Sequence, residues 1–352
     1  MRPADEVELA EWLRLRAGPV CVRGGGTRAI VPVAGEVAGE VLDTGALAGV
    51  RIYEPGSLTL VAGAGTPLAD VEALLAGSWQ RLAFEVPDLR GLLGRSGVST
   101  LGGVVATGAA GPRRVQVGSA RDQVLGLRFV NGAGVVVKAG GRVMKNVTGL
   151  DLSKLMVGSH GRLGVITEVA FRVQAVPEAT RTLVGERGLA EGLAALRAAL
   201  GSPMDVSGAA YAGGRAMIRV EGMAGSVAYR AEALRGRLGG DWSLVEGAGP
   251  WAAVRDVAEF AGRTGNVWRV SVKPSDALAV ATGLAGEAVF DWGGGLIWVL
   301  CDPAVDVRAH LGGRGHATLM RGTGVVFQPE AAAVAALTAG LRAKFDPKGI
   351  FH

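Results

Sequence analysis

The sequence predicts an α+β protein of two domains followed by a C-terminal segment. Its 352 residues fit two domains at roughly 100–200 residues per domain. Its 57 glycines lie inside strand-like and helix-like sequence without a short repeat, so they mark tight turns and close backbone approaches. After Pro177, helical and strand-like stretches alternate, which is typical of a layered α+β domain. We therefore expect a first domain over 1–175, a second over 176–329 and a helix with a tail over 330–352.

The composition narrows the classes of function. The net charge of +5 comes mostly from dispersed arginine, and no basic run alternates with aromatic residues. This disfavours a nucleic-acid surface, whereas anionic small ligands account for the same charge. Cys21 and Cys301 form no CxxC pair, which argues against an iron–sulfur cluster or a zinc ribbon in this chain. Without an apolar run of about 20 residues or a signal-peptide pattern, we expect a cytoplasmic protein that is at most peripheral to a membrane, through its partners.

Apolar periodicity, bounded by glycine and proline, predicts the elements of the first half. In chain order these are a helix over 5–16, strands over 19–22 and 58–61, a helix over 67–76, strands over 124–130 and 135–138, a helix over 151–157 and a strand over 164–173. Thr66 is expected to cap the second helix, with Pro67 at its first position. Asn131-Gly132 predicts a hairpin, because both residues tolerate positive φ.

The same criteria predict the elements of the second half. They are helices over 188–200, 225–237, 251–261, 275–285 and 330–344, and strand-like stretches over 205–221, 267–273, 287–300 and 316–321.

The first segment that carries chemistry is Arg23-Gly24-Gly25-Gly26-Thr27, directly after a buried strand. Glycines without Cβ atoms let successive backbone N–H groups converge on an anion, and Thr27 adds a hydroxyl donor. A pyrophosphate fits this arrangement, and an ordinary glycine turn fits it equally well. The segment is not a Walker loop, because no GKS or GKT follows, and it does not have the GxGxxG pattern of a dinucleotide-binding fingerprint.

Two further glycine-rich segments follow, over 99–108 and 158–168. In the first, Thr100 can cap a short helix whose free N–H groups attract an anion, while Gly102 and Gly103 allow a flat ring or a phosphate to approach. In the second, a glycine loop leads into a β-branched strand whose backbone can bind an adenine edge. A tightly packed Gly/Ala helix and an ordinary buried strand are the alternatives.

Together, in this order and at this spacing, the segments resemble the FAD domain of the vanillyl-alcohol oxidase / p-cresol methylhydroxylase type. The pattern covers about residues 15–175 and includes Arg121–Gly126, while the family's FDP-x-GIF signature stands at 345–351. The resemblance implies a two-subdomain p-cresol methylhydroxylase-type FAD-binding domain, an α+β cap domain with an antiparallel sheet, and a C-terminal segment that returns to the FAD domain. It implies that FAD is bound by Arg23, Gly24, Gly25, Gly26, Thr27, Pro87, Thr100, Leu101, Gly102, Gly103, Thr107, Ser119, Arg121, Asp122, Gly161, Gly164 and Ile166.

The resemblance also implies that FAD is held without a covalent bond. Some family members tether the flavin through a histidine in or beside the first loop, where this chain has Thr27 and Arg28. Larger 2-hydroxy-acid dehydrogenases of the superfamily carry an HxxEH-like metal cluster. The four histidines of this chain do not have that spacing, so we expect no catalytic metal.

Within the superfamily, the chain is similar to the FAD-binding E subunits of glycolate oxidases. The similarity lies in the segments 141–155, 268–271, 291–294 and 315–322, whereas the end at Phe351-His352 and a GVVFQP stretch depart from it. It implies a related FAD subunit and an iron–sulfur subunit as partners, the latter receiving the electrons. Lys145 and Asn146 are expected near the isoalloxazine ring.

Oxidation of a 2-hydroxy acid at a flavin requires an anchor for the carboxylate and a base for the hydroxyl proton. The candidates are Arg269, Arg321 and His316, each of which is otherwise a structural or surface residue. Arg269 faces away from Trp268 if the strand is regular, and Arg321 and His316 reach one pocket only if their strand bends. His160 is expected to be structural.

The reading that follows is an FAD-dependent oxidoreductase subunit that oxidises glycolate or another small 2-hydroxy acid within a complex. The alternatives are a flavin-holding scaffold subunit without turnover and a stand-alone FAD-dependent oxidase of an alcohol or hydroxy acid.

Overall fold

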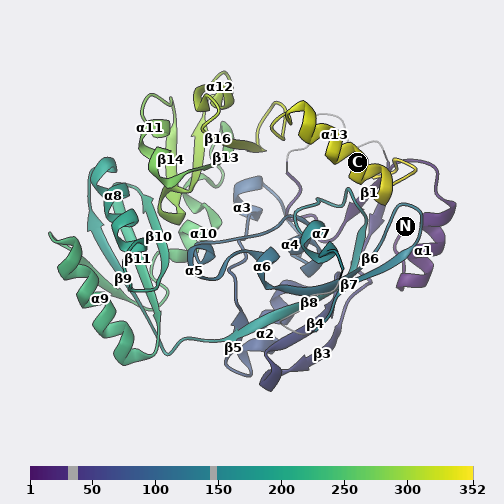
Figure 1. Ribbon diagram of the computed structural model, residues 1–352, viewed down its shortest axis with the longest axis horizontal. Coiled ribbons are helices and arrows are strands. Elements are labelled where there is room, and N and C mark those ends of the chain that lie inside the picture. Colours follow the sequence, from purple (N-terminus) through teal and green to yellow (C-terminus); the bar gives the residue numbers. More distant parts are fainter. Residues whose placement is uncertain (31–38, 143–148, 352) are drawn as a thin grey trace.

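The computed structural model describes residues 1–30, 39–142 and 149–351 (Figure 1). Up to residue 175 it contains α1 (Glu6–Leu15), β1 (Val20–Arg23), β2 (Glu40–Asp43), β3 (Val50–Glu54), β4 (Thr59–Gly63), α2 (Leu68–Ala76), β5 (Gln80–Leu82), α3 (Arg90–Leu93), α4 (Leu101–Ala106), α5 (Arg114–Val117), α6 (Ala120–Gln123), β6 (Val124–Val130), β7 (Val136–Gly140), α7 (Leu152–Met156) and β8 (Val165–Ala175). Beyond it come β9 (Ala179–Glu186), α8 (Leu189–Leu200), β10 (Val206–Ala212), β11 (Arg215–Gly222), α9 (Ala224–Leu238), β12 (Ser243–Glu246), α10 (Trp251–Asp256), β13 (Asn266–Val272), α11 (Ala277–Ala281), β14 (Glu287–Asp291), β15 (Leu296–Cys301), α12 (Val307–Leu311), β16 (Gly315–Arg321) and α13 (Ala332–Phe345).

The first half is built on two sheets. β1 and β2 form a short parallel pair, whereas β3, β4, β8, β6 and β7 form an antiparallel sheet to which β5 adds along β8. The larger sheet shares a core with α2 and α4, in which Leu60, Phe171 and Val104 are fully buried. The predicted two-subdomain architecture is confirmed by this pair of sheets.

The second half consists of two units with the same element order. The first runs β9-α8-β10-β11-α9-β12 and the second β13-α11-β14-β15-α12-β16, so each is a βαββαβ unit of the ferredoxin-like kind. In each unit the strands lie in the order fourth, first, third, second. The units meet at their second strands, β10 and β14, where Tyr211 pairs with Phe290, and together they form one eight-stranded antiparallel sheet.

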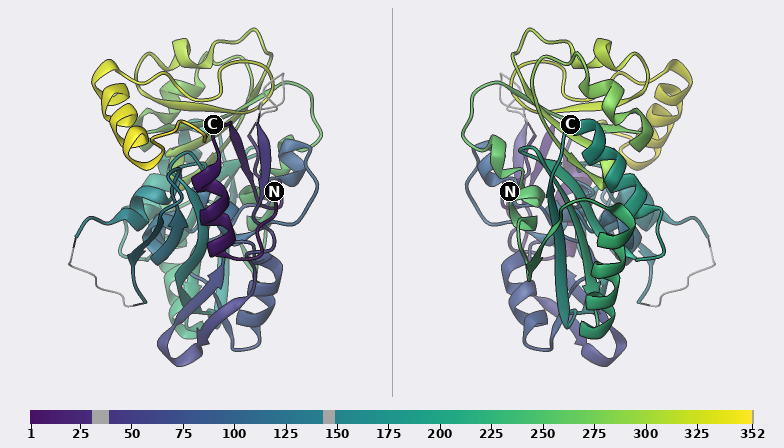
Figure 2. Two further views of the ribbon diagram at one scale, coloured as in Figure 1. Left: turned by 90° about the vertical axis from the view of Figure 1, so that its right-hand side faces the viewer. Right: turned by 90° about the vertical axis from the view of Figure 1, so that its left-hand side faces the viewer.

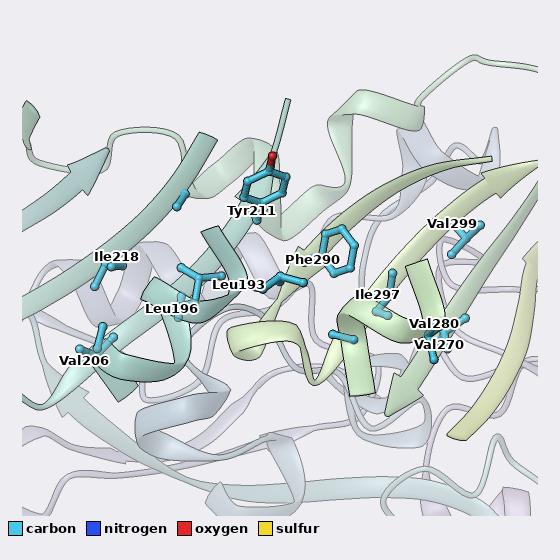
Figure 3. Packing of buried hydrophobic residues seen from close by; sticks show 14 of the residues in the cluster. Leu193, Leu196, Val206, Tyr211, Ile218, Val270, Val280, Phe290, Ile297 and Val299 are labelled. Carbon is cyan, nitrogen blue, oxygen red and sulfur yellow. The ribbon is translucent and has the colours of Figure 1, made fainter. Parts of the chain in front are cut away.

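One face of this sheet is covered by helices of both units (Figure 1). Figure 3 shows Leu193 and Leu196 of α8 against Ile218 of β11, with Phe290, Ile297 and Val270 continuing the same apolar layer into the second unit. Because successive side chains of a strand point to opposite faces, the residues next to these in sequence lie on the other face.

That other face lies against the first half of the molecule. It carries Arg219 and Glu221 of β11, which meet three residues from the first half in a cluster that we call the ion network. Its pairs are Arg219–Glu85 at 2.8 Å, Arg81–Glu221 at 3.0 Å and Arg113–Glu221 at 3.3 Å. An apolar contact continues across the second unit, where residues of α3 pack among side chains of β13, β15 and β16.

The C-terminal segment lies beside the N-terminal elements (Figure 2). The amide of Val20 in β1 donates to the carbonyl of Ile350 at 2.7 Å, and β1 continues its parallel pairing onto Phe351. The carboxylate of Asp346 accepts from the amides of Ile350 and Phe351, which fixes the turn. Lys348 Nζ donates to three carbonyls at the end of α1, a position that favours a cation.

The structure corrects several local predictions. Thr66 does not cap α2, because its hydroxyl donates to the carbonyl of Gly63 and Pro67 occupies the N-cap position. In the β6–β7 hairpin the positive φ belongs to Gly134, while the side chain of Asn131 accepts two backbone amides across the turn. The stretches 205–221 and 287–300 are each two strands joined by a turn, and β2, β3, β5, β9 and β12 were not predicted.

Candidate functional site

The three glycine-rich segments converge on one cavity of about 600 Å³, which we call the cradle. The first segment borders it at the end of β1, the second through α4 and the residues at both its ends, and the third as the loop that leads into β8. Among the residues predicted to bind FAD, those that line it are Arg23, Gly24, Gly25, Gly26, Thr27, Thr100, Gly102, Gly103, Thr107, Gly161, Gly164 and Ile166.

The first loop presents unused donors to the cradle. Within the described residues, the backbone N–H groups of Gly24, Gly25 and Gly26 donate to no protein acceptor. A Cβ atom on Gly25 would lie 1.5 Å from the carbonyl oxygen of Val98, so only glycine allows this approach between the first and second segments. Thr100 caps α4, as predicted, by accepting from the amide of Gly103. Free amides beside a helix N-terminus suit a pyrophosphate, so the residues present fit FAD.

A smaller cavity of about 140 Å³, which we call the inner chamber, adjoins the cradle. Arg28, Ile30, Thr107, His160 and Phe327 line both cavities, so they mark the junction. Its other walls come from the eight-stranded sheet, through Arg269, Trp298, Thr318 and Met320, and from the first half, through Pro87, Leu89 and the stretch 108–110. Among the described residues, no aspartate or glutamate lines either cavity.

Arg28 reaches the chamber from the first loop. Its Nη2 donates to the carbonyl of Pro87 at 2.8 Å and more weakly to Ser99 Oγ at 3.4 Å, while its Nε meets no partner in the described part of the chain. Burial lowers the pKa of Arg28 to about 10, against the opposing effect of Asp88 and Asp256. The side chain is therefore a desolvated cation with donor capacity to spare.

Arg269 enters the chamber from β13, opposite Thr318 of β16. Its guanidinium lies 5.4 Å from the ring centre of Trp292, which also holds Arg114 at 4.7 Å. Burial, together with the nearby charge of Arg114, lowers the pKa of Arg269 to about 10. No carboxylate of the described residues forms an ion pair with Arg269, and as predicted it lies on the sheet face opposite the buried Trp268.

The other two catalytic candidates lie apart from the chamber. Arg321 donates from its guanidinium to the carbonyls of Leu92, Phe260 and Arg263, so its donors tie loops together. His316 is largely exposed on the same strand, two residues before Thr318. Partial desolvation, followed by the charges of Arg308 and Arg269, lowers its pKa. Neither residue lines the cradle or the chamber.

Five residues predicted to bind FAD lie outside the cradle lining, and one of them, Pro87, lines the inner chamber instead. Leu101 is fully buried in the core beneath α4. Ser119 and Asp122 form a capping box on α6, in which Asp122 accepts from the amide of Ser119 at 2.7 Å, and Arg121 is exposed. Their contact with FAD stays a prediction, as does that of the residues lining the cradle. Lys145 and Asn146 fall outside the described residues.

Sequence reasoning missed three contributors to the junction. Arg28 directly follows the first loop but was noted only because it is not a histidine. His160 was expected to be structural, yet it lines both cavities. Phe327 lies in the GVVFQP stretch that matched no family segment, and its only signal was an aromatic residue among apolar ones after a strand.

Two features are absent from the described residues. No group of three or more histidine, cysteine, aspartate or glutamate side chains among them is placed to hold a metal ion. None of their helices has the length and apolar character needed to cross a membrane.

Comparison with known proteins first defines the class. Residues 1–140 match the family of FAD binding domains. The solved structure of an alkyldihydroxyacetonephosphate synthase superposes with a TM-score of 0.71 over 99% of this chain and 76% of that one, at 15% identity, so the two share their fold. The chain is thus a flavoprotein with the p-cresol methylhydroxylase-type FAD fold, in the class of FAD-linked oxidoreductases.

Curated relatives define the family more closely. The glycolate oxidase subunit GlcE of Escherichia coli K12 is 38% identical over 339 residues, which are 95% of this chain and 91% of that protein. The chain belongs to this family of glycolate oxidase subunits. The D-lactate dehydrogenase of Archaeoglobus fulgidus is 31% identical over 176 residues, 49% of this chain and 38% of that protein. The glycolate oxidase subunit GlcD of Bacillus subtilis 168 is 39% identical over 87 residues, 25% of this chain and 18% of that protein.

Proposed function

We propose that the chain is the FAD-carrying E subunit of a glycolate oxidase-type complex and oxidises a small 2-hydroxy acid. The observation that carries the proposal is the junction of two cavities. Within the described residues, one is bordered by free backbone donors and the other by two guanidinium groups that form no ion pair with a carboxylate. An electron acceptor with a pyrophosphate belongs in the first and an organic anion in the second. The names of the relatives, which include glycolate and D-lactate oxidising proteins, agree with this chemistry.

In this proposal the residues 1–175 and 330–352 form the FAD-binding domain, and 176–329 form a cap that supplies the far wall of the chamber. Bound FAD supplies a two-electron acceptor. Arg269 binds the substrate carboxylate, and the apolar walls formed by Ile30, Trp298 and Met320 exclude water around the reacting carbon. The electrons then pass to an iron–sulfur subunit, with a related FAD subunit completing the complex.

The binding of FAD is tested by the visible flavin absorbance of the purified full-length chain. We expect acid precipitation to release all of the flavin, because the proposed cradle holds it without a covalent bond. Gly103 faces the cradle, so Gly103→Leu should remove the flavin, whereas Gly236→Leu on the exposed surface of α9 should leave it in place. A protein that stays colourless after incubation with FAD contradicts the proposal.

Turnover is tested by mixing the FAD-loaded chain with glycolate or D-lactate without oxygen. Rapid bleaching of the flavin supports direct oxidation by this subunit. Absence of bleaching with both acids favours the scaffold alternative, and rapid reoxidation by oxygen without partner subunits favours a stand-alone oxidase. Co-purification of an iron–sulfur protein with the chain from its own cell tests the electron acceptor.

A further inference from the structure

The junction between the cradle and the inner chamber holds a histidine in an unusual backbone conformation. His160 has a φ of +53°, in the left-handed region that is strained for L-residues other than glycine. Its amide donates to the carbonyl of Ala106 in α4 at 2.8 Å, which helps to hold the loop in this shape. Strained residues of this kind are often found where the position of a side chain matters for function.

The imidazole ring packs against a neighbouring side chain, but its nitrogens form no hydrogen bond within the described residues. It packs edge-on against Phe327, with ring centres 5.3 Å apart. The guanidinium of Arg162 lies over the Phe327 ring, 4.5 Å from its centre. Across the described residues, no donor or acceptor forms a hydrogen bond with the imidazole nitrogens of His160. By contrast, His310 on α12 directs Nε2 to the carbonyl of Val280 at 2.8 Å.

Burial and neighbouring cations keep this ring neutral. All the charged residues that line the two cavities around it are cations. They are Arg23, Arg28, Arg162 and Arg269. Burial, followed by the charge of Arg162, lowers the pKa of His160 to about 4. At neutral pH the ring is therefore unprotonated and has a free lone pair, and a substrate carboxylate bound beside it would raise its basicity by offsetting the charge that it gains.

We propose that His160 accepts the hydroxyl proton of a short 2-hydroxy acid whose carboxylate is held between Arg28 and Arg269. This inference rests on the proposed function, which supplies FAD as the oxidant. In the balanced step, the hydrogen on C2 and its electron pair go to the flavin, the hydroxyl proton goes to an imidazole nitrogen of His160, and the 2-oxo acid remains. Arg28 and Arg269 hold the same carboxylate from opposite walls of the chamber, which restricts the substrate to acids with a small side chain.

The experiment uses the FAD-loaded full-length chain and follows flavin reduction by glycolate without oxygen across pH. His160→Asn is the informative variant, because asparagine tolerates the left-handed backbone and does not take up a proton in this range. We expect its limiting reduction rate to fall about 100-fold and to lose the fall in rate that the unmodified chain shows toward acid pH. His310→Gln serves as the matched control and should reduce at the unmodified rate.

Binding of oxalate, an unreactive dicarboxylate, provides a readout that is independent of turnover. Titration of the flavin spectrum or calorimetry should give a dissociation constant for His160→Asn within about threefold of the unmodified value, because the arginines bind the anion. Arg28→Met should weaken oxalate binding about tenfold. Retained flavin content and circular dichroism show that each variant is folded.

The outcomes separate this inference from the proposed function. If glycolate and D-lactate leave the flavin of the unmodified chain oxidised, both proposals are overturned. If the unmodified chain is reduced and His160→Asn is reduced equally fast with the same pH profile, the role of His160 alone is wrong. Unchanged oxalate binding in Arg28→Met overturns the placement of the carboxylate.

Discussion

The two βαββαβ units of the eight-stranded sheet share an order of strands but place a buried arginine in opposite circumstances. In the first unit, all three guanidinium nitrogens of Arg219 donate, to Glu85 and to Ser207. In the second unit, Arg269 lies on the same face of the sheet, and no carboxylate within the described ranges pairs with it. Arg219 therefore stabilises the contact between the two halves, whereas the guanidinium of Arg269 is available to bind an external anion.

The largest expected effect comes from breaking the paired side of this comparison. Arg219→Met leaves Glu85 and the buried Glu221 with fewer counter-charges, so we expect the free energy of unfolding to fall by about 3–5 kcal/mol. Urea denaturation measures this loss. Arg215→Met, at the exposed start of the same strand, is the control and should stay within about 0.5 kcal/mol. Equal losses in both variants would show that the ion network does not stabilise the fold.

A second prediction concerns Asp291, at the end of β14 beside the same network. Burial, reinforced by Glu85, raises its pKa to about 7, although the amide of Trp292 donates to it. The native state thus binds more protons than the unfolded state between about pH 4 and pH 7, so stability falls as pH rises through this window. Asp291→Asn should remove the penalty and stabilise the protein by on the order of 2 kcal/mol above pH 7.

Unfolding curves of Asp291→Asn and the unmodified chain at a series of pH values measure this gain. Near pH 4 the two should converge. A gain that is the same at every pH would contradict a titrating Asp291.

The third prediction addresses the unpaired arginine directly. Arg269→Met removes a desolvated cation that forms no ion pair with the described residues, so we expect the free energy of unfolding to change by less than about 1 kcal/mol. Oxalate binding should nevertheless weaken about tenfold, because a charged donor to the carboxylate is lost. Calorimetric titration and urea denaturation of the same sample measure both. A large stability loss with unchanged oxalate binding would make Arg269 a structural residue like Arg219.

The smallest loss of stability is expected at an exposed ion pair, which serves as a reference for the buried ones. Glu232 and Arg235 form an exposed pair at i and i+3 on α9, with nitrogen and oxygen 2.7 Å apart. Glu232→Gln should cost about 0.3 kcal/mol, since solvent screens both charges. A loss comparable with that of Arg219→Met would remove burial as the reason for the difference between the two kinds of pair.

Local sequence patterns predicted the segments whose geometry depends on neighbouring residues. The three glycine-rich segments, the Thr100 cap and the opposite facing of Trp268 and Arg269 all follow from spacing along the chain, and the structure has them as expected. The pairing order of the eight-stranded sheet could not be predicted from local spacing, because the pairing of β10 with β14 depends on contacts between distant segments.

The junction shows the same limit at the site itself. His160 and Phe327 meet only because the loop before β8 and the segment after β16 are folded against each other. Arg321 and His316 were plausible catalytic residues by residue type. The guanidinium of Arg321 instead donates to backbone carbonyls, and His316 is exposed to solvent, neither of which periodicity alone reveals. The network around Asp291 likewise joins side chains from both halves, so no single segment predicted it.

The bond from Val20 to Ile350 has a consequence for how the chain is made. β1 leads directly into the first glycine loop, yet one of its neighbours is the segment that ends the sequence, tied by Asp346 and by Lys348 at the end of α1. Because Ile350 is far from Val20 along the chain, β1 gains that neighbour long after the first glycine loop has been synthesised. A variant lacking Ile350 would therefore lose a backbone bond to the strand that leads into the cradle.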